Sequence, residues 1–422
     1  MQRRALGHGT LETVALALAS RPGLTILDGD GRSPHGDHSY VACDPVAIFE
    51  ADPAAPLDVL EALGAPSGDD APFPRDVGYV AYDAAFPGRT LPGALPLARF
   101  ARYDAVVRVD ERRGEVEILG VSREAVERLE AALRASPRPL EAPRVDALAE
   151  DDPEAHLEAI ARALEHISAG DVYQLNLTRR WTARFSGEPL PLYLAMREVS
   201  PVPLGFFQAL DRGAILARTM ETFLHFDRRE RALRTRPIKG TRARSGDDAA
   251  TAAALRADPK EHAEHSMIVD LMRNDLGRVA KVGSVHVEAP FLVEDFARLQ
   301  HLVSVVRAEP REDATLRAIF EATFPPGSVT GTPKRRAMQR IDELESCRRG
   351  VYCGAVGHVR HDGSFHFAVA IRTALVAGGE LHYHAGGGIV AGSQPLAELE
   401  ETRLKARVLF DALARLAERA SG

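Results

Sequence analysis

The stretch 365-FHFAVAIRTALVAGGELHYHAGGGIV-390 decides the fold of this chain. Its β-branched, aromatic and aliphatic residues predict one strand over Phe365–Val376 and a second over Leu381–Val390. Gly378-Gly379 between them and Asp362-Gly363 before them are short hairpin turns, so the predicted pairing is antiparallel. A further strand, Tyr352–Arg360, precedes the first turn.

Outside this stretch, strands and helices follow one another in blocks. More strands are predicted at Ala214–Ala217 and Phe223–Phe226, and helices at Pro259–Leu276, Asp313–Ala322, Lys334–Leu344 and Pro395–Ala417. Strict β–α–β alternation is absent, so the pattern predicts an α+β fold with layers of antiparallel sheet.

The N-terminal third contains strands and turns, including a predicted hairpin of Ala105–Val109 against Glu115–Leu119. Residues Ala135–Asp152 are rich in proline and acid and have little apolar periodicity, which is typical of a linker. Asp152-Pro153 then begins a helix, as an N-cap and a proline at the first helical position. We predict an N-terminal subdomain over residues 1–145 and a larger domain over residues 146–422.

Composition and charge exclude several classes of protein. With 53 basic and 60 acidic residues among 422, the net charge of −7 argues against a general nucleic-acid surface. No segment approaches the ~20 apolar residues of a membrane span. Cys43, Cys347 and Cys353 lack zinc spacing and suit a reducing compartment. A cytoplasmic protein without nucleic-acid or membrane partners is expected.

Two Glu-x-x-Glu pairs are the first candidates for chemistry. Glu261 and Glu264 lie near the start of one predicted helix, which Asp258-Pro259 caps, and Glu398 and Glu401 lie near the start of the last. Spacing of three puts each pair on one helical face, and two such faces would offer oxygen ligands to Mg²⁺. Solvated acidic helix starts are the alternative, which spacing alone favours.

Lys239 lies in the basic run 234-RTRPIKGTRAR-244. The arginines on either side predict like-charge repulsion, which favours the neutral, nucleophilic form of the lysine. A basic surface loop is the alternative and, without further context, the better one.

Other residues could meet an anion. The turn Phe324–Lys334 offers backbone N–H groups at a helix start, although a purely structural turn fits equally well. Arg372 interrupts an apolar strand, so a structural acid or a substrate carboxylate must face it if it is buried. His301 lies in an apolar run, where a satisfied core histidine is usual. Gln174 belongs to the polar face of an alternating strand, either an exposed sheet face or the wall of a polar cleft.

Taken in order, eight segments between Asp171 and Lys405 resemble the chorismate-utilising enzyme family. They are DVYQLNL (171–177), TRPIKGT (235–241), AEHSMIVDLMRNDL (263–276), HLVS (301–304), GSVTGTPK (327–334), YCGAVG (352–357), IRTA (371–374) and ETRLKA (401–406). Each is short, but their order makes a chance match implausible. The functional interpretations above are then favoured over the structural ones.

The resemblance implies a fold like that of anthranilate synthase component I, with layered antiparallel sheets in a sandwich-like core covered by helices. It also implies chorismate as substrate and Mg²⁺ as cofactor, with Glu264 and Glu401 as direct ligands and Glu261 and Glu398 in support. The residues implied to contact substrate are Arg372 and Tyr352 at a carboxylate, Gly386 and Gly388 through their backbone, Thr330 and Gly331 at the ring and carboxylates, and His301 beside the departing hydroxyl.

Two positions imply the subclass. Members that add water to the ring carry lysine where this chain has Gln174, so isochorismate synthases are disfavoured. Anthranilate synthases typically carry alanine where this chain has Lys239, and lysine there is the pattern of aminodeoxychorismate synthase component I. The implied mechanism is covalent: Lys239 attacks C2 as the C4 hydroxyl leaves, and ammonia then adds at C4 and expels the lysine. Glu221, in TMETF (219–223), is the implied general acid.

No glutamine-amidotransferase segment is recognised, so ammonia is expected from a separate glutaminase subunit. Ile26–Gly29 replaces the Leu-Leu-Glu-Ser run of the family's regulatory tryptophan pocket, and no tryptophan binding is predicted. Two alternatives stay open: anthranilate synthase component I, and a catalytically silent homologue that acts as a binding subunit.

Overall fold

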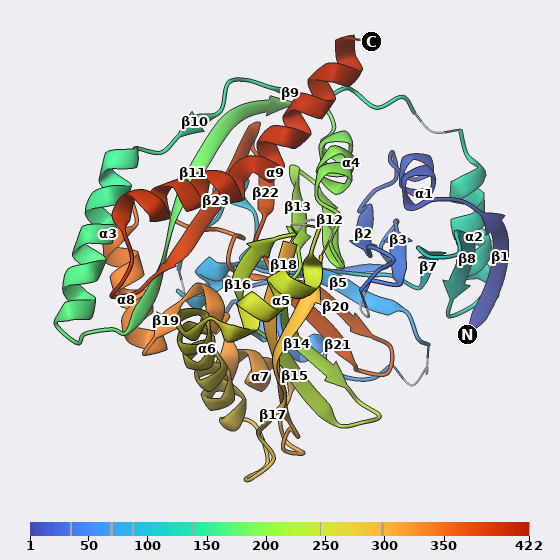
Figure 1. The fold of residues 1–422 in the computed structure, drawn as a ribbon. Coiled ribbons are helices and arrows are strands. Elements are labelled where there is room, and N and C mark those ends of the chain that lie inside the picture. Colours follow the sequence, from blue (N-terminus) through green and yellow to red (C-terminus); the bar gives the residue numbers. More distant parts are fainter. Residues whose placement is uncertain are drawn as a thin grey trace.

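Two large antiparallel sheets pack against each other and are flanked by helices (Figure 1). The computed structural model describes residues 1–33, 36–67, 71–86, 88–136, 138–244, 246–296 and 299–421. Within these residues one sheet has 13 strands and the other has 10. The predicted α+β class with layered antiparallel sheets is confirmed.

The first sheet combines strands from both ends of the chain. In spatial order it contains β1 (Gln2–His8), β8 (Glu115–Gly120), β7 (Ala105–Asp110), β3 (His38–Ala42), β2 (Thr25–Asp28), β12 (Leu204–Leu210), β13 (Gly213–Thr219), β22 (Thr373–Ala377), β23 (Glu380–Ile389), β11 (Gln174–Ser186) and β10 (Ala149–Glu150), and β9 (Arg144–Val145) and β19 (Gly331–Thr332) also pair with β11. The predicted hairpin of β7 and β8 is confirmed.

The second sheet also draws on both parts of the chain. Its order is β16 (Ile238–Ala243), β18 (Leu299–Ala308), β15 (Ala232–Arg236), β14 (Thr222–Asp227), β21 (Phe365–Val369), β20 (Ala355–Arg360), β5 (Pro74–Val80), β6 (Ala98–Arg102) and β4 (Ala47–Glu50), and β17 (His286–Asp295) pairs with β18. Strands from before and after residue 145 therefore share both sheets, and the division at that residue stays a proposal about the organisation of the chain.

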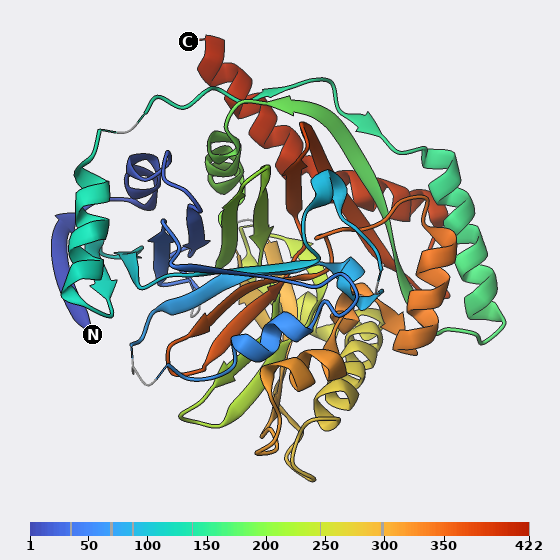
Figure 2. The same cartoon turned by 180° about the vertical axis from the view of Figure 1, so that it is seen from behind.

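Helices cover the outer faces of the sheets (Figure 2). They are α1 (Leu11–Ala17), α2 (Arg123–Arg134), α3 (Pro153–Ser168), α4 (Pro189–Val199), α5 (Asp248–Ala257), α6 (Pro259–Gly277), α7 (Leu316–Thr323), α8 (Lys334–Leu344) and α9 (Pro395–Ser421), with short 3₁₀ turns at Asp58–Ala62, Tyr82–Ala85, Pro92–Ala94 and Gly327–Val329. The predicted N-caps Asp152 and Asp258 are confirmed, each followed by proline. Helix α7 begins later than predicted because the Thr315 side chain caps it by accepting from the Ala318 N–H. Among the described residues, no helix is long and apolar enough to cross a membrane.

The stretch 365–390 departs from its prediction in one respect. The expected single strand Phe365–Val376 is broken at Ala370–Arg372, and its halves, β21 and β22, belong to different sheets. Arg372 has a φ of 52°, a left-handed conformation that a strand cannot continue through. Both predicted hairpins are confirmed, β20 with β21 and β22 with β23. The break is therefore a crossing point between the two layers.

Residue alternation along β22 shows how the layers pack. Leu375 and Ala377 belong to the central core between the sheets, which α6 and α7 extend on the far side of the second sheet. Ala374 and Val376 point the other way, into an outer core beneath α4 and α9. Since both faces are covered, this part of the first sheet is apolar in both phases, and each fully buried Val or Leu contributes roughly 1.5–3 kcal/mol.

Candidate active site

The predicted lysine and substrate segments meet where the β16 edge of the second sheet approaches β11 and β23 of the first (Figure 1). Lys239 Nζ lies 3.0 Å from the point where a Cβ on Gly388 would stand, and Gln174 Nε2 lies 2.8 Å from the same point. Any side chain at Gly388 would displace one of these two groups. The glycine therefore makes room for a lysine and an amide at the surface of the first sheet.

The acidic pair of α6 lies beside this lysine. Glu264 Oε2 is 3.4 Å from Lys239 Nζ. Glu261 lies against the next residue, Gly240, whose φ is +73°, and its Oε2 is 2.9 Å from where a Cβ would stand. Burial raises the pKa of Glu261, and the like charge of Glu264 adds to the rise.

The acidic pair of α9, a helix that packs on the first sheet, lies beside the glycines of β23. Glu398 Oε2 lies 3.1 Å from where a Cβ on Gly387 would stand. Burial raises the pKa of Glu398, and Glu401 adds to that rise. Burial also acts to raise the pKa of Glu401, but Lys405, with Nζ 2.5 Å from Oε1, outweighs it and holds the pKa below its ordinary value. Lys239 acts electrostatically on both carboxyls, so the two pairs share one lysine.

These carboxylates fit a magnesium ion in chemical type. Mg²⁺ prefers oxygen ligands, and a cation would relieve the repulsion within each pair. Across the described ranges, however, no three acidic, histidine or cysteine side chains are gathered closely enough to enclose an ion. The metal site therefore stays a prediction from the resemblance.

The like-charge environment predicted for Lys239 is wrong. Each of the four flanking arginines is paired with an acid: Arg234 with Glu230 and Glu288, Arg236 with Glu294, Arg242 with Asp258, and Arg244 with Asp248. The charges that act on Lys239 are the carboxylates of α6 and α9 and the ammonium group of Lys405, not the flanking guanidinium groups. The arginine pairs hold β15, β16 and the residue after β16 to their neighbours.

Arg372 lies at the crossing between the layers and is half-buried, not inside a strand as predicted. Its Nη1 donates to the Lys405 carbonyl at 2.8 Å. Its guanidinium forms no ion pair with the residues that the structure describes, although Glu401 is near enough to interact with it electrostatically. His301 on β18 is 5% exposed, and burial, with Arg372 nearby, lowers its pKa to about 4. The histidine is therefore neutral at physiological pH.

Tyr352 is buried in the turn before β20, not in the strand as predicted. Cys353 after it has a φ of 66°, which keeps the strand from starting before Ala355. The Tyr352 ring stacks on His384 of β23, with centroids 5.4 Å apart. This contact joins the start of the second-sheet strand to the glycine-containing strand of the first sheet.

Glu221 lies in the turn between β13 and β14, close enough to Lys239 to interact electrostatically. Burial raises the pKa of Glu221 to about 7, although Ser328 and Lys239 oppose the rise. A carboxyl group with this pKa is partly protonated at neutral pH and can donate a proton.

The remaining predicted contacts line the same region of β11. Thr330 is fully buried, and its hydroxyl donates to the carbonyls of Pro326 and Gly327, so the side chain holds the turn. Gly331, at φ +152°, passes so close to the Gln174 carbonyl that no Cβ fits. Both polar atoms of the Gln174 side chain are buried without a hydrogen-bond partner among the described residues. The polar face of β11 is thus buried, which favours the cleft wall over an exposed sheet face.

Lys405 is a site residue that the sequence reasoning treated only as half of an ordinary helix pair. It is half-buried, and its Nζ donates to the Gly386 carbonyl at 2.7 Å besides pairing with Glu401. Burial lowers its pKa, opposed by Glu401. Its spacing of four from Glu401 was the available signal, but nothing in the sequence shows that β23 lies beneath it.

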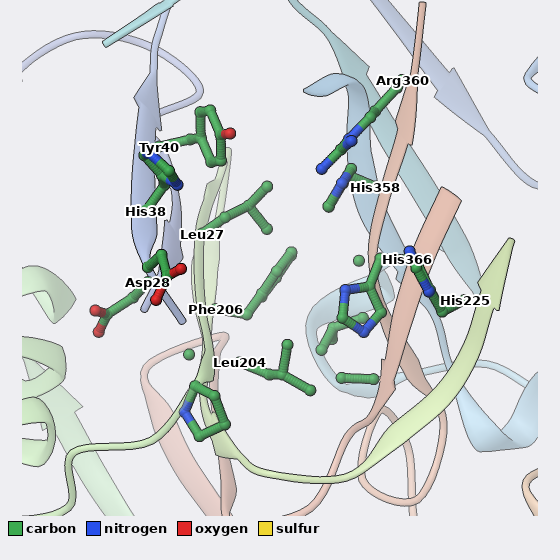
Figure 3. A pocket seen from close by; sticks show the side chains of 16 residues that line it. Leu27, Asp28, His38, Tyr40, Leu204, Phe206, His225, His358, Arg360 and His366 are labelled. Carbon is green, nitrogen blue, oxygen red and sulfur yellow. The ribbon is translucent and has the colours of Figure 1, made fainter. Parts of the chain in front are cut away.

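A second space lies between the same two sheets, away from Lys239 (Figure 3). This histidine cavity has a volume of about 210 Å³ and lies between β2, β3 and β12 on one side and β14, β20 and β21 on the other. His225, His366 and His358 stand in register on three adjacent strands and face it. Asp28 on the opposite wall accepts from Tyr193 and Arg197 at 3.0 Å each and from Arg218.

Comparisons with known proteins agree with the resemblance in the sequence. The chain is 38% identical over 417 residues to anthranilate synthase component 1 of Streptomyces coelicolor, across 90% of this chain and 81% of that protein. It is 43% identical over 248 residues to aminodeoxychorismate synthase component 1 of Escherichia coli, across 58% of this chain and 54% of that protein. The crystal structure of anthranilate synthase component I from Streptococcus pneumoniae matches with a TM-score of 0.78 at 29% identity, covering 90% of this chain and 93% of that one.

The family of chorismate binding enzymes matches residues 29–411, a range that contains both acidic pairs, Lys239 and the glycines of β23. Because this match spans most of the chain, the fold, the site region and the family agree. The chain belongs to the chorismate-binding enzyme family.

Proposed function

We propose that this protein aminates chorismate at C4, as component I of an aminodeoxychorismate synthase. The observation that supports this most is Lys239, whose ammonium group lies against Gly388 and Gln174, inside the region where the family motifs meet. Lysine is the residue that the resemblance links to covalent amination at C4. The E. coli aminodeoxychorismate synthase component 1 is 43% identical over the 248 residues that it matches.

The proposed chemistry assigns one proton or bond to each group. Lys239 Nζ, once it has lost a proton, forms a bond to C2 of the ring while the C4–O bond breaks. Glu221, protonated near neutral pH, gives its proton to the departing hydroxyl. Ammonia then forms a bond at C4, the bond from Lys239 to C2 breaks, and 4-amino-4-deoxychorismate leaves.

The substrate's two carboxylates need two positive partners. We propose that Arg372, which forms no ion pair among the described residues, binds one of them with Tyr352 beside it. Magnesium, held by Glu264 and Glu401 with Glu261 and Glu398 in support, would supply positive charge for the other. His301, neutral and buried, would hydrogen-bond near the C4 hydroxyl. Gln174, Thr330, Gly331, Gly386 and Gly388 would form the surrounding wall.

The source of ammonia is proposed to be a separate glutamine amidotransferase subunit. Both named relatives are called component 1, which implies a further component.

Anthranilate synthase component I is the second candidate, in which amination at C2 is followed by loss of pyruvate. Its support is the length of the match, since the Streptomyces coelicolor enzyme covers 90% of this chain against 58% for the E. coli aminodeoxychorismate synthase component 1. The two candidates share the fold, the acidic pairs and the ammonia requirement. Lys239 is the reason to prefer the first, and the identity of the product decides between them.

The test is to incubate the protein with chorismate, Mg²⁺ and ammonium and to identify the product by mass spectrometry. The main proposal expects a product that retains the enolpyruvyl group and has gained an amine. Fluorescent anthranilate with release of pyruvate would instead establish the second candidate. A catalytically silent homologue would leave chorismate unchanged. Glu264→Gln and Glu401→Gln should each weaken the magnesium dependence, and unaltered dependence in both would remove the acidic pairs from the metal site.

A further inference from the structure

A pocket beside the proposed chorismate site has no role in the chemistry above. It has a volume of about 470 Å³, and the residues that matter here are Arg180, Ser346, Cys347, Tyr352, Thr373 and His384. We call it the Cys347 pocket. Two of its residues connect it with the site: Tyr352 is itself a proposed substrate contact, and Thr373 follows Arg372 in the chain.

The pocket and the site share one face of one strand pair. Gly388 pairs with Asn176, Gly386 with Thr178, and His384 with Arg180 in the β11–β23 ladder. Side chains alternate along a strand, so residues two apart share a face and stand about 7 Å from one another. The face that carries the site glycines therefore continues directly to His384 in the pocket.

A stacked pair of rings, Tyr352 and His384, lines the pocket. Tyr352 and His384 are 6% and 5% exposed, and their rings lie nearly parallel, with an interplanar angle of 15°. The Nδ1 atom of His384 is buried and has no hydrogen-bond partner among the described residues. A buried polar atom without a partner is rare and marks a position where a small polar molecule can bind.

The buried cation of the pocket, Arg349, is paired with Glu345, and Arg180 lies 3.5 Å from Asp151. Arg348 also lines the pocket, but it is exposed. Burial lowers the pKa of His384 far below its usual range, so the imidazole is uncharged. A dianion such as chorismate finds no unpaired cation deep in this pocket, whereas ammonia, small and neutral, can donate to or accept from the imidazole.

We propose that the Cys347 pocket is the antechamber through which ammonia reaches the chorismate site, passing the stacked pair of Tyr352 and His384. This inference rests on the proposed amination, because a chorismate enzyme that uses no ammonia has no need of such a chamber.

The test attaches a removable group to an introduced cysteine at the exposed edge of the pocket, which narrows the entrance. Ser346 is exposed, Cys347 can be replaced by serine, and Cys43 and Cys353 are buried. In a Ser346→Cys, Cys347→Ser double variant, the new thiol is modified with methyl or benzyl methanethiosulfonate, and the Cys347→Ser single variant treated in the same way is the matched control. Ammonium-driven turnover is then measured against both substrates.

The expected result is a KM for ammonium that rises with adduct size, on the order of tenfold for the benzyl group, with an unchanged KM for chorismate. Dithiothreitol should restore the original value. An unchanged KM for ammonium in fully modified protein would overturn the proposal, and so would a parallel rise in the KM for chorismate. Failure of the amination itself is distinguishable, because the unmodified variant would then form no aminated product.

Discussion

The two spaces between the sheets, the Lys239 site and the histidine cavity, differ in how their polar groups are balanced. At the site, Lys239 faces carboxylates from two helices, and Arg372 forms no ion pair among the described residues. In the histidine cavity, Asp28 is saturated by Arg197, Arg218 and Tyr193. A bound ligand can balance the charges at the Lys239 site, whereas the charge of Asp28 in the histidine cavity is already balanced by arginines of the protein.

This difference follows from the strands that line each space. The site lies on a strand whose glycines expose backbone and admit side chains from the opposite sheet. The cavity is lined by strands that carry imidazoles, which burial keeps neutral, so a folded chain can enclose them without counter-ions. Substitutions at the Lys239 site should therefore lower activity, and substitutions at the histidine cavity should lower stability.

The largest effect is expected for Lys239→Ala. Removing the proposed nucleophile should lower kcat for ammonium-dependent amination by roughly 10⁴-fold while the protein stays folded. Turnover is measured by product chromatography, and folding by circular dichroism. Lys281→Ala, which removes a surface lysine paired with Glu309, is the matched control and should keep full activity. Normal turnover of Lys239→Ala would contradict the covalent mechanism and remove the main reason to prefer C4 amination.

The next largest effect is expected at the histidine cavity, in Asp28→Ala. Arg218 is 1% exposed at its side chain and would lose its counter-ion, so we expect about 3–5 kcal/mol of lost unfolding free energy. Asp270→Ala breaks the exposed pair with Arg273 on α6 and should cost about 0–1 kcal/mol. Denaturant titration measures both. Equal losses in the two variants would show that burial of the Asp28 network carries no special weight.

A smaller effect, confined to one limb of the pH profile, is expected for Glu221→Gln. Burial raises the pKa of Glu221 to about 7, so the proton it donates is present below that pH and lost above it. Activity of the unaltered protein should therefore fall as pH rises through about 7. The variant should be about 10²-fold slower and should lack this limb. A variant that keeps the same alkaline limb would assign it to another group.

Local patterns predicted much of the fold, because caps and turns depend on neighbouring residues. Helix α8 begins at Lys334 and ends at Leu344 as predicted, and the capped starts at Asp152 and Asp258 are correct. The break at Arg372 could not be predicted in the same way. Ala370 and Ile371 continue the apolar pattern, and only the need to cross between layers turns the chain there.

At the site, too, the residues within short motifs were predicted, whereas their contacts with residues far away in the chain were not. The resemblance singled out Lys239 and both acidic pairs, which the fold brings together from β16, α6 and α9. The surroundings of Lys239 were predicted wrongly, because the partners of its flanking arginines come from segments distant in the chain. Lys405 was missed for the same reason, since its contact with the Gly386 carbonyl exists only after α9 packs on β23.

The smallest effect concerns the pH dependence of stability at the histidine cavity. Burial, with Arg360 nearby, lowers the pKa of His225 from its usual 6.5 to about 4. The unfolded chain therefore binds the proton more readily between these values, and unfolding free energy should fall as pH drops from about 6.5 to 4, by on the order of 1 kcal/mol per pH unit. His225→Phe removes this proton, so its stability curve should be flatter across that window.

The same two proteins compared at pH 7.5, where the imidazole is neutral in both states, provide the control for packing differences. A constant offset between the curves from pH 7.5 to 4 would show that His225 changes packing but not proton linkage. If the difference in unfolding free energy between the two proteins changes as the pH falls, the buried neutral imidazole of His225 lowers stability in acid. The pH dependence of turnover should be the same in His225→Phe as in the unaltered protein over this window, because the variant leaves every group around Lys239 in place.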